Sequence, residues 1–456
     1  MGEGLAIEEG DNEKRGWKIS KSALTEELKK EGAIAAPMVV VTILQYLVQV
    51  VSVIMVGHLG QLSLSSVAIA TSLTNVTGFS VLSGMAGGLE TLCGQAYGAE
   101  QYQKFGTYTY SAIISLTLVC APISVLWIFM DKILLLFGQD PSISMEARKF
   151  SILLIPALFG AAILKPLTRY FQTQSLIFPM MLNSSMVLCF HIATCWTLVF
   201  KLGFGHVGAA LSFSLCTWLN VVLLGFYVKF SVACEKTRIA FSKQALVGIG
   251  EFFRFGVPSA VMVCLTISTL HFTIPYGFGA AASTRVSNEL GGGNPQAARV
   301  AVLAAMLLAV IEAVIVSATL FSCRHVLGYA YSNERQVVKY VAVMTPLICL
   351  SVFMDSLQAV LSGVARGSGW QHVGAYVNLG AFYLVGIPVA AVLGFLAHFR
   401  AKGLWIGIVA GSIVQSIFLS IVTALTNWKK QANLARERIF DHASSESNIG
   451  PESNHG

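Results

Sequence analysis

"SNELGGGNPQAARV", residues 287–300, is a polar, glycine-rich stretch between two long apolar runs, and a weaker copy, "GQAYGAEQYQKFG", occupies residues 94–106. The later copy has the order of residues that separates two helices. Gly291 suits a left-handed residue after one helix, and Asn294 and Pro295 suit the cap and first position of the next. The stretch therefore predicts a tight corner between helices. A triple glycine that follows no strand is not typical of a phosphate-binding loop.

The two corners belong to a longer internal repeat. Asn378 aligns with Asn183 at a shift of 195 positions, and a shift of 193 aligns several other residues of the same or similar type. These pairs are Gly277 with Gly84, Thr284 with Thr91, Asn288 with Gln95, Gly291 with Gly98, and Gln296 with Gln103. The repeat predicts a duplicated bundle, a common plan among transporters.

The composition is that of a membrane protein. Of 456 residues, 55% are apolar and 12% are charged, and the mean hydropathy is +0.69, which is too apolar for a soluble protein. Runs long enough to cross a hydrocarbon layer of about 30 Å recur along the chain, and they lack the alternation of barrel strands. The predicted spans are 33–56, 66–89, 108–130, 148–168, 176–200, 206–228, 256–282, 300–323, 337–362, 373–397 and 403–426. The expected fold class is all-α, a polytopic membrane protein with two pseudo-repeated helical bundles and about 11 spans.

One block of the repeat is missing from the second half. Pro37 opens the first span and Pro258 opens its counterpart, but they lie 221 positions apart rather than 193, so about 28 residues, roughly 44–71, have no partner. At about 1.5 Å per residue this block is about 42 Å of helix, more than one crossing. We therefore expect six helices over 33–230 and a truncated bundle of about five over 256–426.

The basic residues conflict with five crossings. They cluster at 14–30, 229–254 and 429–438, and all three clusters are expected on the cytoplasmic side. This makes 1–31, 231–255 and 427–456 a cytoplasmic tail, interlobe loop and second tail. Six crossings between the first two clusters agree with this placement, but five between the last two do not. Either 256–282 fails to cross as an ordinary helix, with a bend at Pro275 and Gly277, or the second bundle inserts under strain.

Other classes of protein find little support. The nine cysteines form no CxxC and no Cys/His cluster, so they predict neither a metal site nor a disulfide framework. The net charge of +7 is concentrated beside the spans, which favours membrane orientation over nucleic-acid binding. No GxSxG or HExxH motif indicates an enzyme, and no filter-like loop indicates a channel. We expect no cofactor apart from a proton gradient, and a monomer, since nothing marks an oligomer interface.

Six motifs resemble a known family. They are "MVGHLG", "LETLCGQAYGAEQY", "RYFQTQS", "HVGAALS", "STRVSNELGGGNPQAARVAV" and "DSLQAVLSGVARGSGWQ", spread over roughly residues 30–430. Together they resemble the plant branch of the multidrug and toxic compound extrusion (MATE) family. The resemblance implies two lobes of six helices around a V-shaped cleft. It also implies export of organic cations, xenobiotics or plant secondary metabolites such as alkaloids, flavonoids or organic acids, in exchange for protons, at the plasma or vacuolar membrane. A flippase for lipids or lipid-linked molecules, and a multispan protein that transports nothing, are alternatives.

Two acidic residues, Glu312 and Asp355, lie well inside predicted spans. An ionised carboxylate is costly in hydrocarbon, so such a residue can hold a proton that an arriving cation displaces. Asp355 also matches the acid before "SLQ" to which the resemblance assigns proton coupling. The alternatives are structural: Asp355 would bond to Ser351 or Gln358 one turn away, and Glu312 would bond between helices.

The resemblance also implies a second acid in the seventh span, within a Glu-Trp-Trp-like stretch. That position falls inside the missing block, so no residue of this chain corresponds to it. We therefore expect the transport activity of this chain to be impaired.

Further polar residues within predicted spans are candidates for lining the cleft. They are Gln45, Gln49, Asn75, Asn183, His191 and Asn378. Such residues more often form hydrogen bonds between helices than bind a ligand. His191 is of the type that titrates near neutral pH, although a neutral, hydrogen-bonded imidazole is its more common state. Arg169 and Arg366 close equivalent spans, and we interpret them as anchors at the membrane interface.

Overall fold

The structure is a computed structural model that describes residues 21–264, 273–327, 335–399 and 401–447. Within these ranges the regular elements are all helices. Nine helical segments are long and apolar enough to cross a membrane, or ten if α8 (Pro141–Leu153) and α9 (Ile155–Thr173), bent by 45°, count as one span. Large apolar side chains such as Leu136, Leu384 and Leu425 are at least 78% exposed, as expected of helices that face lipid. The prediction of an all-α, multi-pass membrane protein is confirmed.

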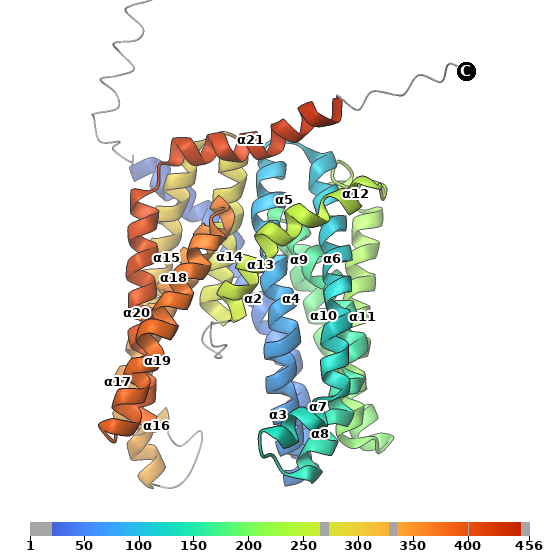
Figure 1. Ribbon diagram of the computed structural model, residues 1–456, viewed down its shortest axis with the longest axis vertical. Helices are drawn as coiled ribbons and strands as arrows, with labels where there is room; N and C mark the ends of the chain where they lie inside the picture. The colour runs from blue at the N-terminus through green and yellow to red at the C-terminus, as the bar shows by residue number, and fades with distance from the viewer. Residues whose placement is uncertain (1–20, 265–272, 328–334, 400, 448–456) are drawn as a thin grey trace, which may run out of the picture.

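The N-terminal half holds six of these segments, counting the bent pair as one (Figure 1). Besides α8 and α9, its elements are α2 (Lys21–Gly57), α3 (Gln61–Thr74), η1 (Asn75–Phe79), α4 (Ser80–Ala86), α5 (Gly88–Gly98), α6 (Tyr102–Ile128), α7 (Met130–Leu136), α10 (Ile177–Trp196), η2 (Thr197–Lys201) and α11 (Gly205–Phe230). The second crossing runs continuously from α3 to α5 but includes η1, one turn of π-helix. Such a turn inserts an extra residue and changes the direction in which side chains point.

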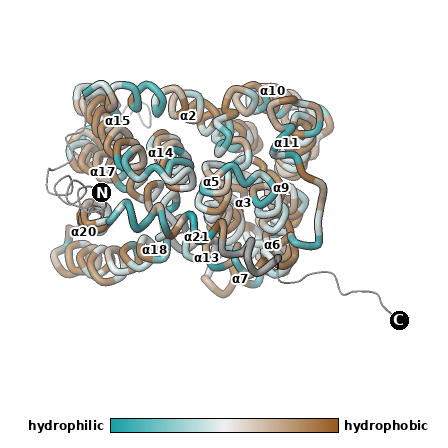
Figure 2. The backbone as a smooth tube through the Cα atoms, turned by 90° about the horizontal axis from the view of Figure 1, so that it is seen from above, coloured by the Kyte–Doolittle hydropathy of each residue, from teal (hydrophilic) through white to brown (hydrophobic). Residues whose placement is uncertain are grey.

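The C-terminal half holds four long segments and two short helices, and it follows a connector with η3 (Val232–Cys234) and α12 (Gln244–Val247). Its elements are α13 (Ile249–Cys264), α14 (Thr273–Gly291), α15 (Pro295–Ser322), α16 (Arg324–Leu327), α17 (Arg335–Ser368), α18 (Gln371–Leu379), η5 (Gly380–Gly386), α19 (Ile387–Ala391), η6 (Val392–Leu396), α20 (Ala401–Leu425) and α21 (Trp428–Ser447). Seen from above, the two halves lie side by side (Figure 2). Helix α21 lies across one end of the molecule and packs on α5, α14 and α15.

Two short helices replace the single span predicted over 256–282, so that prediction is wrong. Helix α13 runs inward from the end that carries α21, and α14 runs back toward it (Figure 1). With 16 and 19 residues, they are about 24 and 28 Å long, each shorter than a hydrocarbon layer of about 30 Å. The alternative that 256–282 fails to cross as an ordinary helix is confirmed, but the break does not lie at Pro275 and Gly277, because both residues lie inside α14. Residues 265–272, which join the two helices, lie outside the described part of the chain.

This arrangement removes the conflict between the number of crossings and the expected cytoplasmic position of the basic residues. Helices α13 and α14 return the chain to the end at which it entered, and the four long segments of the C-terminal half then bring it back to that end once more. The start of α2, the connector with α12, and α21 therefore lie at one end of the molecule (Figure 1). The described residues of the three basic clusters belong to the helices and the connector at this end.

Backbone conformations repeat between the halves. Glu100 and Gly293, 193 positions apart, have φ angles of 59° and 77°, and Ser175 and Gly369, 194 positions apart, have φ angles of 58° and 84°. The π-helices η2 and η6 are offset by 195 positions. The same left-handed corners thus recur in both halves, even where the residue type differs, and the predicted pseudo-repeat is present in the backbone.

The glycine-rich corner follows the predicted order with one correction. Pro295 opens α15, and Asn294 precedes it at the cap position. The left-handed residue, however, is Gly293 rather than Gly291. Gly291 is the last residue of α14, and a side-chain carbon there would overlap the backbone oxygen of Gln95 on α5. Gly291 is therefore required for close packing of the two halves and not for the turn.

Candidate functional site

Glu312 on α15 and Asp355 on α17 each lie beside serine hydroxyl groups. Ser356 Oγ lies 2.7 Å from Glu312 Oε2, and the hydroxyls of Ser351 and Ser412 lie 3.3 and 3.5 Å from the two Asp355 oxygens. Both carboxyl groups belong to half-buried residues. A hydroxyl can donate to a carboxylate or accept from a protonated carboxyl. These hydroxyl groups are therefore able to accommodate both protonation states with little movement.

Gln45 and Gln49 line a cavity in the N-terminal half that has a volume of about 140 Å³ accessible to water. Gln49 Nε2 donates to Asn75 Oδ1 at 3.2 Å, and both residues line a smaller neighbouring cavity. Asn183 donates from its side-chain nitrogen to the Asn220 oxygen, and Asn220 lines the larger cavity. The structure thus brings four of the polar candidates to one region of the N-terminal half.

The other two polar candidates are enclosed by protein. His191 is fully buried, with its ring nitrogens 2.9 Å from Ser52 Oγ and 3.1 Å from Ser212 Oγ. It lines neither of the two cavities. Asn378 on α18 is also fully buried. Both positions suit hydrogen bonding between helices.

The π-helical turn η1 shapes the wall of the larger cavity. Phe79, its last residue, lines that cavity together with Phe213 of α11. The two ring centroids are 5.8 Å apart and the rings meet edge to face, which is a favoured geometry for aromatic pairs. One side of the cavity is therefore aromatic, whereas Gln45, Gln49 and Asn220 contribute amide groups.

Lys165 on α9 lines the same cavity, and the sequence analysis did not single it out. Its position could have been noticed in the sequence, because Lys165 is a lone basic residue inside the predicted span 148–168. The prediction of charged site residues, however, was restricted to acids within spans. Lys165 makes no hydrogen bond or ion pair with any described residue. No aspartate or glutamate is among the residues that line this cavity.

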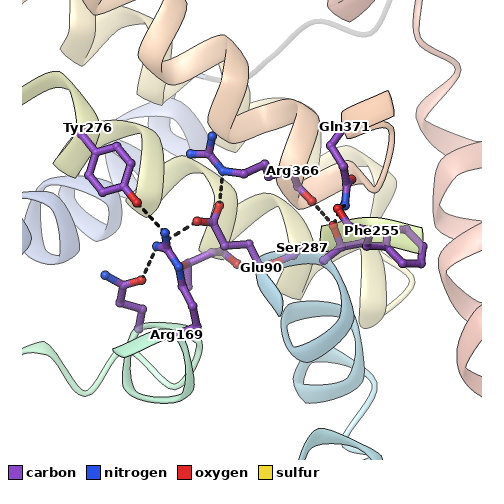
Figure 3. A network of polar contacts seen from close by, with 10 residues as sticks. Glu90, Arg169, Phe255, Tyr276, Ser287, Arg366 and Gln371 are labelled. Atoms are coloured by element: carbon purple, nitrogen blue, oxygen red, sulfur yellow. Dashed lines mark hydrogen bonds and ion pairs between the residues drawn. The ribbon is translucent and has the colours of Figure 1, made fainter. Parts of the chain in front are cut away.

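A third polar cluster joins the two halves (Figure 3). Glu90 on α5 forms ion pairs of 2.8 Å with Arg169 on α9 and with Arg366 on α17. Arg169 Nη1 also donates to Gln172 Oε1 at 2.7 Å, and Nη2 donates to the hydroxyl of Tyr276 on α14. All three charged side chains are buried. The interpretation of Arg169 and Arg366 as interfacial anchors is therefore wrong, because both guanidinium groups share one buried carboxylate.

Glu90 was not among the predicted site residues, although it lies in the motif "LETLCGQAYGAEQY". It directly follows the predicted span 66–89 and so was not counted as an acid inside a span. The fact that Arg169 and Arg366 end equivalent spans indicated that they belong together, but the sequence did not show their common partner.

Comparison with known proteins identifies related chains. The profile of the MatE family matches residues 37–197 and 259–392. Protein DETOXIFICATION 1 of Arabidopsis thaliana is 51% identical over 445 residues, covering 91% of this chain and 94% of its own length, and Protein DETOXIFICATION 14 is 50% identical over 450 residues, covering 92% and 93%.

Solved structures of similar fold also include MATE transporters. The crystal structure of the eukaryotic MATE transporter AtDTX14 superposes with a TM-score of 0.88 at 51% identity, covering 91% of this chain and all of that one. An outward-facing multidrug resistance MATE transporter superposes with a TM-score of 0.77 at 16% identity, covering 92% of this chain and all of that one. The second likeness shows the fold alone.

Proposed function

The chain belongs to the MATE family of multidrug and xenobiotic efflux transporters, not to a family of enzymes, and we propose that it exchanges small organic molecules for protons held at Asp355 and Glu312. The observation that carries this proposal is the set of serine hydroxyl groups beside the two acids. Ser356, which bonds to Glu312, directly follows Asp355 in the chain.

Export follows from competition for these acids. When both carboxyl groups are protonated the site is neutral, and a cationic molecule has little attraction to it. Loss of a proton creates a negative charge in a low-dielectric region, where an unpaired charge is unfavourable. A cation from the side that received the proton then binds, and re-protonation from the other side of the membrane releases the cation there. The serine hydroxyls support both forms of the site.

We also propose that the short α13–α14 pair weakens export. The two helices span about 24 and 28 Å, so the C-terminal half lacks the outer parts of two crossings that a complete repeat would supply. No residue of this chain corresponds to the acid that the resemblance implies for the seventh span.

A vesicle assay tests the exchange. The purified chain, and a form with α13 and α14 extended by the corresponding segment of Protein DETOXIFICATION 1, are placed in liposomes with an acidic interior. Ethidium accumulation and internal pH are followed together. We expect ethidium to drive proton release, and Asp355→Asn in the extended form to reduce both rates at least about tenfold, as for removal of a required proton carrier.

Glu235→Gln is the matched control, because Glu235 is an exposed acid in the connector. It should leave both rates unchanged. Proton release that is insensitive to Asp355→Asn, or pH-independent movement of a fluorescent lipid without ethidium transport, would refute the exchange mechanism; the second result would favour a flippase.

A further inference from the structure

Glu31 on α2 lies where α2 packs on α14 of the other half, and we propose that it is a proton-binding site at this junction, separate from Asp355 and Glu312. The site holds its proton at neutral pH, and the proton keeps the contact between the two helices free of an unpaired charge. The proposal does not rest on proton exchange at Asp355, because the junction needs a neutral Glu31 whether or not the chain transports a substrate.

The position of Glu31 on α2 places its carboxyl group inside the protein. Glu31 is 1% exposed, and it lies on the same face of the helix as Ala35 and Met38, one and two turns further on, which are also buried. Helix α14 packs closely against this part of α2: a side-chain carbon at Gly277 would lie 2.8 Å from the side chain of Val39. The surroundings of the carboxyl group along α2 are therefore apolar, and an ionised carboxylate is unfavourable there.

Within the described part of the chain, Glu31 has no partner that could stabilise a negative charge. Its Oε1 atom is buried without a hydrogen bond, and neither of its oxygens forms an ion pair with a described residue. The charged groups that act on it are Glu27, one turn earlier on α2, and Arg285 on α14. Helices α3, α10, α11 and α15 also pack on α2, but they bring no charged group of the described residues to Glu31.

Arg285 cannot serve as the missing partner, because two other acids already hold it. Its Nε donates to Glu27 Oε1 at 2.7 Å, and its Nη2 donates to Glu289 Oε1 at 2.8 Å. With an ionised Glu31, three negative charges would surround one positive charge. Glu27 and Glu31 are also one turn apart on α2, a spacing at which like charges repel each other. A proton on Glu31 removes this repulsion.

The protonation of Glu31 bears on a contact between the halves. The ion pair of Glu27 with Arg285 joins residues 258 positions apart, near the end of the molecule that carries α21 (Figure 1). Ionisation of Glu31 would add a second carboxylate of α2 that competes with Glu27 for Arg285. The neutral form of Glu31 therefore stabilises the packing of α2 on α14.

Infrared spectroscopy of the purified full chain tests the protonation directly, because the C=O group of a protonated carboxyl absorbs at a different frequency from a carboxylate. The spectrum of the unaltered chain at neutral pH, minus that of Glu31→Gln, should contain the band of a protonated carboxyl group. Asp355 and Glu312 are present in both proteins, so their bands cancel. The Glu31 band should disappear as the pH is raised.

Glu26→Gln is the matched control. Glu26 lies on the same helix, and its pair with Lys30 is exposed to solvent, so it is ionised at neutral pH. The spectrum of the unaltered chain minus that of Glu26→Gln should therefore lack the band of a protonated carboxyl group.

Two further measurements separate protonation of Glu31 from indirect effects. Glu27→Gln makes Arg285 available to Glu31, so the affinity of Glu31 for its proton should fall at least about tenfold, and the band should disappear at a lower pH. Glu31→Gln has the shape of a protonated glutamate, so its melting temperature at neutral pH should be no lower than that of the unaltered chain. Absence of the Glu31 band, an unchanged titration of the band in Glu27→Gln, or a marked loss of stability in Glu31→Gln would overturn the proposal, and none of these outcomes depends on transport.

Discussion

Glu90 and Arg366 come from opposite halves of the chain, 276 positions apart, and form a buried ion pair of 2.8 Å. The same carboxylate pairs with Arg169 of its own half. A single carboxylate therefore partly neutralises the charge of two buried arginines. It also joins the two halves near the end that carries α21. Glu90 is therefore a charged residue whose loss would affect both halves at once.

Glu90→Gln should strongly destabilise the protein. Removing one member of a buried ion pair leaves the partner charge uncompensated, at a cost of about 3–5 kcal/mol, and here two arginines lose their partner. The measurement is the melting temperature in detergent. Glu26→Gln is the control: its pair with Lys30 is exposed to solvent, so its loss should leave the melting temperature nearly unchanged. Similar melting temperatures for the two variants would contradict the assigned role of Glu90.

Gly98→Ala should also destabilise the protein, but through space rather than charge. A side-chain carbon at Gly98 would overlap the backbone oxygen of Asn288 on α14, so the helices of the two halves must move apart, at a cost of about 1–3 kcal/mol. Gly32→Ala is a control that should increase the stability of the protein. Nothing lies within 4 Å of its added carbon, and alanine within a helix is favoured over glycine by about 0.5–1 kcal/mol. Thermal unfolding of both variants distinguishes the two effects.

Arg438→Ala should loosen α21 from the bundle. Arg438 Nη1 donates to Gln95 Oε1 at 2.9 Å, and its guanidinium lies 5.6 Å from the centre of the Phe255 ring. Loss of a charged hydrogen bond should make local opening about tenfold more frequent. Hydrogen exchange of α21 amides measures this opening. Lys430→Ala, an exposed change in the same helix, should leave the exchange rates as they are.

Extending α13 and α14 should increase export. Insertion after Cys264 of the segment of about 28 residues that the repeat lacks would give each helix a full crossing and supply the missing acid. We expect proton-driven ethidium transport in vesicles to rise at least about tenfold, as for restoration of a missing proton carrier. Equal rates with and without the segment would mean that the short pair does not limit transport.

The membrane class and the repeat were predictable because they depend on local patterns. Long apolar runs specify spans, and turn residues such as Pro295 specify corners. The repeat also indicated which residues of the two halves correspond, as for Asn183 and Asn378. These features need no knowledge of which helices touch.

The contacts between helices were not predictable in this way. Glu90 looked like a residue at the end of a span, and Arg169 and Arg366 looked like anchors, because pairing across 276 positions leaves no local pattern. Lys165 was missed for a related reason: whether a lone lysine reaches the membrane surface or lines a cavity depends on packing. The short pair α13–α14 was misread as one helix, since 256–282 has the length of an ordinary span.

The α13–α14 hairpin also bears on how sequences of this kind can vary. Helix α13 begins and helix α14 ends at the same end of the molecule. Residues gained or lost between them therefore change how far the two helices reach into the membrane, but not the side of the membrane on which the later loops lie. Deletion of any one complete crossing elsewhere would turn every later helix upside down. Splice forms or lineages that differ at this tip can therefore share one insertion pathway.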